Sequence, residues 1–434
     1  MTGTGLTSTE DRATEERALG RLAAEELRNA VGGIGGLHRG IAERVFSGVE
    51  KGVGPAAAPV RLVHDALSDR IYAAMRAATG AVGLGAAEAA VRLRDDPTAP
   101  APSTTRRGSL AIGILTGLRG DVLDREANPI AQPMAVRVGG AAVAPRHDAL
   151  ATAFPAATPH LVVFLHGLFE TEFSWRLGAG EDGETYGSRL ARDLGCTPID
   201  VRYNTGRHIS ENGRSLSELL EDLVAEWPVE VEQVALVGHS MGGLVARSAC
   251  HVAATEDARW VKRVRHVVSL GSPHFGAPLE ELVHVAAVGL GRLPETRPIS
   301  NFLRRRSSGI RDLRRGSLVD EDWRDCDPEA LRAAVCQEVP LLEGATHCFV
   351  SATVTRSPKH PVGRMVGDLL VLVPSASGES RTRRLGFKSE HGAHLGGATH
   401  FALLNHPVVY EKLRGWLAMP PEALASAPAA LPAG

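Results

Sequence analysis

The chain has 434 residues, of which 44% are hydrophobic, 23% are charged and 4% are aromatic. This composition is ordinary for a soluble globular protein and excludes a wholly disordered or collagen-like chain. The formal net charge of −2 argues against generic nucleic-acid binding, which needs a basic balance or a basic face. We expect either one large domain with an extension or two domains.

The amino-terminal segment is polar and acidic, without the basic start and apolar run of a signal peptide. No uncharged apolar stretch is long enough for a membrane span. The cysteines are scattered and form no CxxC pair, so reduced thiols are expected. These features together predict a cytoplasmic location. The five cysteines are Cys196, Cys250, Cys326, Cys336 and Cys348.

Both ends of the chain, residues 1–12 and 419–434, have the composition of disordered tails. Residues 13–127 are predicted to form a helical extension, in which two amphipathic patterns suggest a helical hairpin and a Pro/Ser/Thr-rich linker follows. The hairpin is interpreted as a packing accessory, with a membrane-surface or partner-binding element as the alternative. The apolar positions are Val31, Ile34, Leu37, Ile41, Val45 and Val49, then Val60, Val63, Leu67, Ile71, Met75 and Ala78.

From residue 128 to residue 418 the pattern changes to short apolar runs that alternate with helical periodicity. This alternation predicts an α/β domain with a mostly parallel central sheet and helices on both faces. A hairpin is expected first, at MAVRV and GGAAV. Buried strands are then expected at residues 161–165, 197–203, 234–238, 266–271 and 347–354. Leu216, Leu219, Leu220 and Leu223 mark a helix between two of these strands.

Residues 278–346 interrupt this alternation of strands and helices, because no clear strand pattern occurs among them. We interpret this segment as a cap or lid insertion above the sheet. It is rich in arginine, which indicates either a solvated face or contact with an anionic head group or membrane surface. The arginines are Arg292, Arg297, Arg304, Arg305, Arg306, Arg311, Arg314 and Arg315.

The sharpest motif is Gly238-His239-Ser240-Met241-Gly242, which follows an apolar strand and precedes a helical pattern. This is the strand–turn–helix context of a GxSxG nucleophile elbow. The turn is so tight that neighbouring side chains would collide, which explains the glycines. Ser240 is therefore the predicted nucleophile.

The strand at residues 161–165 ends in His166-Gly167, giving the sequence FLHGLFE. In this type of fold the following loop lies beside the elbow. We expect the backbone N–H groups of Leu168 and Met241 to form an oxyanion hole. His166 is expected to make structural hydrogen bonds.

The acid and the base should follow the nucleophile in the order Ser, Asp/Glu, His. Asp368 lies between Gly367 and an apolar run and is the predicted acid. Glu379 and Asp327 are the alternatives.

His400 precedes the final helical pattern and is the predicted base. The other candidates are His391 and His394, in a glycine-rich loop, and His406. His406 immediately precedes Pro407, which suits the first turn of the last helix. A metal site at His391, His394 and His400 is not expected, because carboxylates or thiols at ligand spacing are missing.

Several segments together resemble the α/β-hydrolase superfamily: FLHGL, VGHSMGGLVARSA and SLGSPHFGAPLE. Within it they are similar to the bacterial lipase and esterase branch related to GPI inositol-deacylases. HFALLNHPVVYEKLRGWL resembles its catalytic-histidine segment, with His400 at the matching place, and VGDLLVLVPSASG resembles its acid loop, with Asp368 as the acid. The resemblance spans about residues 130–418 and implies an eight-stranded core and a lid. GPI anchors are not implied as the substrate.

The leading hypothesis is a serine carboxylic-ester hydrolase that acts on lipid or acyl esters through Ser240, His400 and Asp368 and an acyl-enzyme, without a cofactor. The same residues would serve an acyltransferase, and a non-catalytic binding protein with a hydrolase fold is a third hypothesis. The expected partner is a small-molecule or lipid ester. Nucleic acid is not expected. Peripheral membrane contact is considered through the amino-terminal helices or the arginine-rich lid.

Overall fold

The computed structural model describes residues 12–22, 24–25, 99–276, 307–324, 336–357, 359–380 and 383–419. The predicted helical hairpin, most of both tails, the arginines at 292–306 and Asp327 lie outside these ranges. Among the described residues, no helix has the length and apolar character to cross a membrane.

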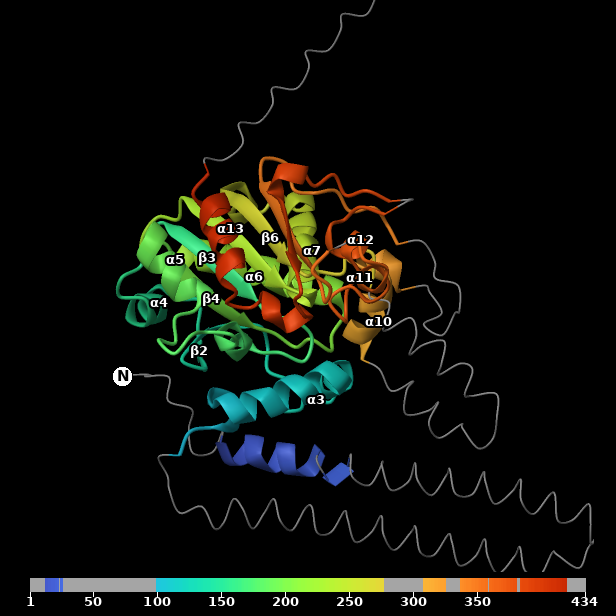
Figure 1. The fold of residues 1–434 in the computed structure, drawn as a ribbon. Coiled ribbons are helices and arrows are strands. Elements are labelled where there is room, and N and C mark those ends of the chain that lie inside the picture. Colours follow the sequence, from blue (N-terminus) through green and yellow to red (C-terminus); the bar gives the residue numbers. More distant parts are fainter. Residues whose placement is uncertain are drawn as a thin grey trace, which may run out of the picture.

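One sheet of eight strands organises the molecule, in the order β2-β1-β4-β3-β5-β6-β7-β8 (Figure 1). All neighbouring pairs from β4 to β8 are parallel, whereas β1 is antiparallel to both β2 and β4. The predicted hairpin and the five predicted buried strands are confirmed. The strands are β1 (Ala135–Val138), β2 (Ala141–Val143), β3 (His160–Leu165), β4 (Thr197–Arg202), β5 (Gln233–His239), β6 (Val264–Leu270), β7 (Thr346–Thr353) and β8 (Gly392–Gly396).

Strand β8 corrects the prediction of a glycine-rich loop around His391 and His394. Residues Gly392–Gly396 pair in parallel with β7 at the edge of the sheet. The segment has no apolar run, because an edge strand needs little burial when backbone hydrogen bonds to its neighbour hold it. Gly392 also allows close approach, since a Cβ atom there would lie 2.4 Å from the ring of Phe349. Sequence periodicity cannot signal such a strand.

Helices cover both faces of the sheet, which is the predicted α/β architecture. They are α3 (Arg106–Arg125), α4 (His147–Ala153), α5 (Tyr186–Leu194), α6 (Ile209–Glu226), α7 (Met241–Thr255), α10 (Ser308–Arg315), α11 (Pro361–Val366), α12 (Val373–Ala376) and α13 (Pro407–Leu417). Side chains from α6 and α7 share one apolar cluster with the sheet, and side chains from α5 and α13 share the other. Strand β3 contributes to both clusters, which explains its unbroken apolar sequence.

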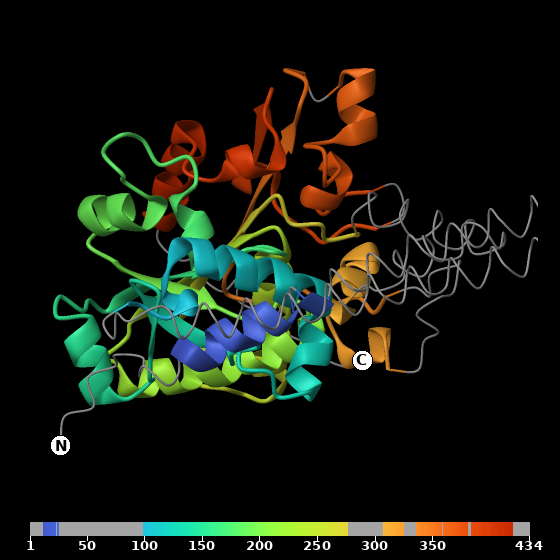
Figure 2. The same ribbon diagram turned by 90° about the horizontal axis from the view of Figure 1, so that it is seen from below.

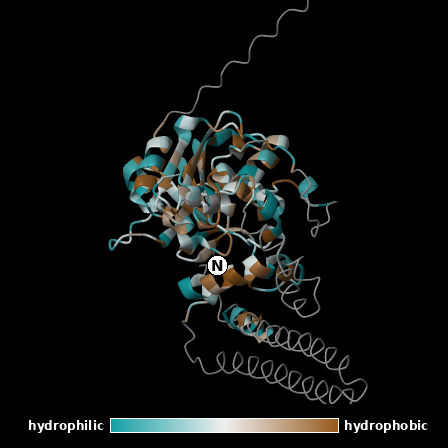
Figure 3. Cartoon of the chain, turned by 45° about the vertical axis from the view of Figure 1, so that its right-hand side comes forward, coloured by the Kyte–Doolittle hydropathy of each residue, from teal (hydrophilic) through white to brown (hydrophobic). Residues whose placement is uncertain are grey.

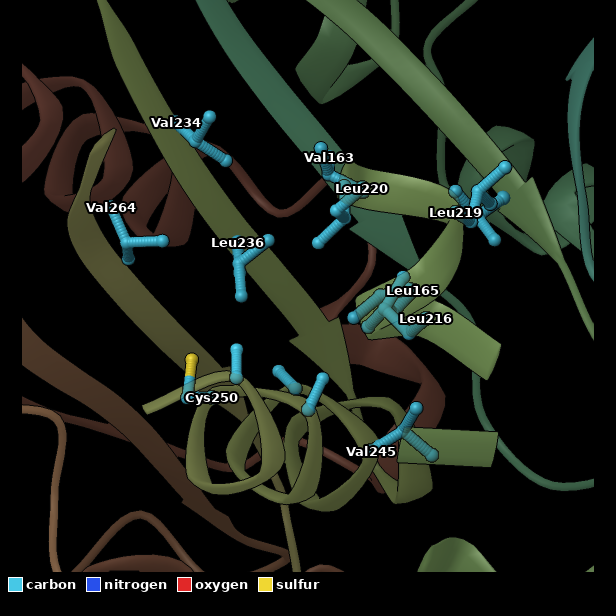
Figure 4. Packing of buried hydrophobic residues seen from close by; sticks show 14 of the residues in the cluster. Val163, Leu165, Leu216, Leu219, Leu220, Val234, Leu236, Val245, Cys250 and Val264 are labelled. Atoms are coloured by element: carbon cyan, nitrogen blue, oxygen red, sulfur yellow. The ribbon is translucent and has the colours of Figure 1, made fainter. Parts of the chain in front are cut away.

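The larger core cluster lies between the sheet and helices α6 and α7 (Figure 4). The four leucines predicted to mark a helix all lie on the buried face of α6. They meet β-branched and leucine side chains from the parallel strands, such as Val163 and Leu236. This packing fixes the position of β5 and α7, and therefore the turn between them.

The amino-terminal residues pack onto the domain through α3. Residues 12–22 are helical and lie alongside α3 (Figures 1 and 2). The contact is apolar at Ala18 and Leu22, which cluster with Ile112 and Leu123. Helix α3 also carries exposed apolar side chains, namely Leu110, Ile114 and Leu118. Figure 3 colours the chain by hydropathy, and the part of the helical ribbon that belongs to hydrophobic residues is brown.

The predicted Pro/Ser/Thr linker, residues 96–108, is ordered in its second half and does not act as a loose spacer. Its last residues already belong to α3, which begins at Arg106 with Thr105 as its N-cap. Ser103 is buried, and its backbone N–H and hydroxyl both donate to the carboxylate of Glu15, at 2.9 and 2.7 Å. Its carbonyl oxygen accepts from Arg202 at 2.7 Å. Hydrogen bonds from distant residues therefore hold a sequence that looks like a linker.

The described part of the predicted lid packs against the body of the domain. Helix α10 begins at Ser308, and the hydroxyl of Ser307 donates to the carbonyl oxygen of Gly117 in α3 at 2.6 Å. Asp312 accepts hydrogen bonds at the start of α6, from the backbone N–H of Ile209 at 2.8 Å. Arg314 is buried and therefore does not belong to a solvated arginine face. Residues 307–324 thus connect α3 and α6.

Candidate active site

Ser240 lies at a strained turn between β5 and α7. Its backbone has φ 52° and ψ −120°, a conformation that side-chain-bearing residues rarely adopt. The flanking glycines permit the turn, because a Cβ atom on Gly238 would lie 2.3 Å from the nitrogen of Gly243 and one on Gly242 would lie 2.1 Å from the carbonyl oxygen of Leu165. The predicted strand–turn–helix context is confirmed. The turn leaves Ser240 partly accessible while its neighbours in the motif are buried.

Asp368 and His400, the predicted acid and base, lie together. The Nδ1 atom of His400 is 2.7 Å from Oδ2 of Asp368, and both side chains are buried. The other carboxylate oxygen of Asp368 accepts from the backbone N–H groups of Leu370 and Val371, at 3.0 and 2.8 Å. The backbone N–H of His400 donates to the carbonyl oxygen of Asp368 at 3.0 Å. The carboxylate is thus held in one orientation, with one oxygen left for the imidazole.

Asp368 does not directly follow a strand. Strand β7 ends at Thr353, and helix α11 intervenes before Asp368. The chain returns to the end of β7, where Val354 N–H donates to the carbonyl oxygen of Gly367 at 2.9 Å. The apolar run after Asp368 forms a turn and helix α12 instead of a strand, and Leu369 in it is 57% exposed. The hydrogen bonds to Asp368 explain why a turn forms at this apolar sequence.

The remaining ring nitrogen of His400, Nε2, is buried and has no hydrogen-bond partner among the described residues. His400 lies next to the segment that holds the elbow. A Cβ atom on Gly271 would be 3.1 Å from Cε1 of His400, and the preceding carbonyl, of Leu270, accepts from Ser240 N–H at 2.9 Å. The His400 ring centroid is also 4.8 Å from that of His239, the neighbour of Ser240. An imidazole oriented by a carboxylate and carrying a free nitrogen is suited to take up a proton.

The loop after β3 lies against the elbow, as predicted. A Cβ atom on Gly167 would be only 3.0 Å from Cβ of Ser240. Within the described chain, the backbone N–H groups of Leu168 and Met241 donate to no other residue. Phe169 has φ 64°, so this loop is strained directly after Leu168. Two unpaired backbone donors near a nucleophile are the arrangement expected of an oxyanion hole.

Helix α3 supports this loop from behind. A Cβ atom on Gly113 would be 2.8 Å from the carbonyl oxygen of Phe169, and one on Gly117 would be 2.2 Å from its ring. Only glycine permits so close an approach. The residues N-terminal to the sheet therefore contact the loop that carries Leu168.

Glu170 is a residue of the site that the sequence reasoning missed. Its buried carboxylate accepts from Gly167 N–H at 2.7 Å and lies 3.0 Å from Nδ1 of His239. Although burial acts to raise it, the charge and hydrogen bond of His239 lower the pKa of Glu170 to about 2. The available signal was an acidic residue directly after FLHGLF, in a loop that the fold buries.

The other candidate residues have different surroundings. His166 stacks on Tyr203, and its Nε2 accepts from the backbone N–H of Tyr203 at 3.3 Å. Burial lowers the pKa of His166, which suits the predicted structural role. His394 contacts hydroxyls of β7, and His406 caps α13 by accepting from Val408 N–H at 3.2 Å. Glu379 is exposed and pairs with Arg384, away from any described histidine.

Among known proteins, no curated protein sequence matches the chain. Residues 160–297 match the family model described as the PGAP1-like alpha/beta domain. This range contains the loop after β3 and the elbow, and it ends before Asp368 and His400.

Solved structures similar to this chain include lipases and esterases. The mature form of a Bacillus licheniformis lipase is 19% identical, with 61% of this chain and 94% of that chain covered and a TM-score of 0.40. A Pyrobaculum calidifontis esterase is 16% identical, with 73% of this chain and 91% of that chain covered and a TM-score of 0.35. A Staphylococcus hyicus lipase is 14% identical, with 60% of this chain and 94% of that chain covered and a TM-score of 0.33. The strand order and the family match identify the chain as a protein of the α/β-hydrolase fold that is similar, over residues 160–297, to the PGAP1-like alpha/beta domain.

Proposed function

We propose that the protein is a serine carboxylic-ester hydrolase. The observation that carries the proposal is the buried pair of His400 and Asp368, in which Nε2 of His400 has no partner among the described residues and the imidazole lies 4.8 Å, between ring centroids, from His239, the residue before Ser240. An exposed serine alone is common, and a buried His–Asp pair alone can be structural. Their combination at the carboxyl ends of parallel strands is what acyl-transfer chemistry needs.

The mechanism assigns one task to each residue. His400 takes the proton from the Ser240 hydroxyl as the oxygen attacks the ester carbonyl. Asp368 holds the imidazole with Nδ1–H toward the carboxylate and stabilises the imidazolium. The N–H groups of Leu168 and Met241 bind the oxyanion, and His400 then protonates the leaving alcohol. Water, activated by the same imidazole, releases the acid.

An acyl or lipid ester is the proposed substrate class. Two exposed apolar side chains directly follow triad residues: Leu369 is 57% exposed and Phe401 is 49% exposed. Ligand sites are lined mainly by apolar side chains, and these two would offer apolar contacts to the acyl chain of a bound ester.

The test is turnover of p-nitrophenyl esters from acetate to palmitate. Wild type should hydrolyse them, while Ser240→Ala should lose both turnover and labelling by a fluorophosphonate. Asp368→Asn should lower kcat up to about 10⁴-fold, because the imidazole then has the wrong tautomer. Unchanged turnover in Ser240→Ala would reject the proposal. Ester products formed with added glycerol would instead favour the acyltransferase, and absence of both turnover and labelling would favour a binding protein.

A further inference from the structure

The carboxylate of Glu170 and the proposed nucleophile both lie close to Gly167. A single Cβ atom placed on Gly167 would be 3.0 Å from Oε1 of Glu170 and 3.0 Å from Cβ of Ser240. A bare negative charge there would repel the oxyanion that develops during acyl transfer. A carboxylate in this place is compatible with the proposed chemistry only if its charge is neutralised.

His239 provides that neutralisation. Its Nδ1 lies 3.0 and 3.2 Å from the two carboxylate oxygens of Glu170, and its Nε2 lies 3.4 Å from the carbonyl oxygen of His400. Carboxylate and carbonyl oxygens only accept hydrogen bonds, so each ring nitrogen that donates to one of them must carry a proton. With both nitrogens protonated, His239 is an imidazolium and the pair as a whole is neutral.

The electrostatic surroundings agree with this geometry. Burial acts to lower the pKa of His239, but Glu170, followed by the hydrogen bond to His400 and the charge of Asp368, raises it above its ordinary value. The pKa of Glu170 is lowered by His239 and, to a smaller extent, by His166. The charged groups named here are the ones that dominate the pKa shifts of Glu170 and His239.

The pair also joins the three segments that carry the reaction. Glu170 accepts from Gly167 N–H at 2.7 Å and so orients the His166–Gly167 peptide, one residue before the N–H of Leu168. His239 precedes Ser240 in the elbow, and its Nε2 contacts the backbone of the base. We propose that Glu170 and His239 are a neutral positioning pair. The pair fixes the relative positions of the loop after β3 that carries Leu168 (the oxyanion loop), the nucleophile and the base for ester hydrolysis. This inference rests on the proposed function.

The experiment compares Glu170→Gln, His239→Gln and the double variant in ester turnover. Rates are normalised by fluorophosphonate titration of active sites, so that only folded enzyme counts. The matched control is Asp312→Asn in α10, which alters another His–carboxylate pair: buried Asp312 lies 3.1 Å from Nδ1 of the partly buried His208, at the start of α6. The control should lose stability and keep the kcat of wild type.

His239→Gln should show the largest loss, about 100-fold in kcat, because it leaves the carboxylate unpaired next to the oxyanion. Glu170→Gln keeps an acceptor for Gly167 N–H and should lose only about 10-fold. The double variant should recover activity relative to His239→Gln, and KM should change little throughout, since the oxyanion exists only in the transition state.

A double variant that is no better than His239→Gln would overturn the inference, and so would an equal loss of kcat in Asp312→Asn. If wild type is active and the variants of Glu170 and His239 keep its kcat, the positioning role of the pair is rejected and the proposed function is not. Wild type without turnover or labelling would reject the proposed function and the pair together.

Discussion

Gly113 in α3 offers the clearest way to ask whether the amino-terminal residues control catalysis. Replacing it with alanine places a Cβ atom 2.8 Å from the carbonyl oxygen of Phe169 and 3.0 Å from that of Glu170. Ordinary contact begins near 3.4 Å, so helix and loop must separate by about 0.6 Å. The helix is anchored along its length, for example by Ser307, whose hydroxyl donates to Gly117. We therefore expect the strained loop to move.

The expected magnitudes follow from this displacement. A misplacement of about 1 Å can cost about 100-fold in rate, so a shift of about 0.6 Å should lower kcat about 10-fold. Overpacking costs about 1–3 kcal/mol, which the helix preference of alanine offsets by about 0.5–1 kcal/mol. The net loss in the free energy of unfolding should be about 1 kcal/mol.

The matched control is Gly415→Ala in α13, where a Cβ atom would meet nothing within 4 Å. This variant should gain about 0.5–1 kcal/mol and keep its activity. Both proteins are assayed for ester turnover per labelled active site and for urea-induced unfolding. A Gly113→Ala enzyme with the kcat of wild type, at any stability, would refute the idea that α3 positions the oxyanion loop.

Two further predictions concern charged side chains on strand β4. Glu172→Gln leaves the buried guanidinium of Arg202 without its carboxylate and should lower the free energy of unfolding in urea by about 3–5 kcal/mol. The control is Glu379→Gln, which removes a carboxylate that is 63% exposed and should lower it by less than about 1 kcal/mol. Equal losses in the two variants would contradict the argument. Burial, followed by the nearby charge of Glu172, raises the pKa of Asp200 from 3.8 to about 7. The protonated carboxyl therefore contributes stability to the folded state, fully below about pH 4, and this contribution is lost as the pH rises through about 7. Asp200→Asn cannot lose it, and its melting temperature relative to wild type should rise from pH 4 to pH 8; a difference independent of pH would show that Asp200 titrates normally.

Much of the architecture could be predicted from local pattern. The strands from β3 to β7 are recognisable from their short apolar runs, which are least interrupted in β3 because that strand is buried on both faces. The elbow is recognisable because a turn of this sharpness excludes side chains at Gly238 and Gly242. Chain order then led to Asp368 and His400, which the fold places 2.7 Å apart. In each case the requirement acts within a few residues or follows from a fixed strand order.

Other features depended on partners far away in the sequence. Strand β8 has no apolar signal and exists because β7 supplies its hydrogen bonds. The apparent linker at Ser103 is ordered because Glu15 and Arg202 satisfy its polar groups. Glu170 became part of the site only when the fold buried it against His239. Burying a polar group requires a specific partner, and no local pattern encodes a partner that the tertiary structure alone brings within hydrogen-bonding distance.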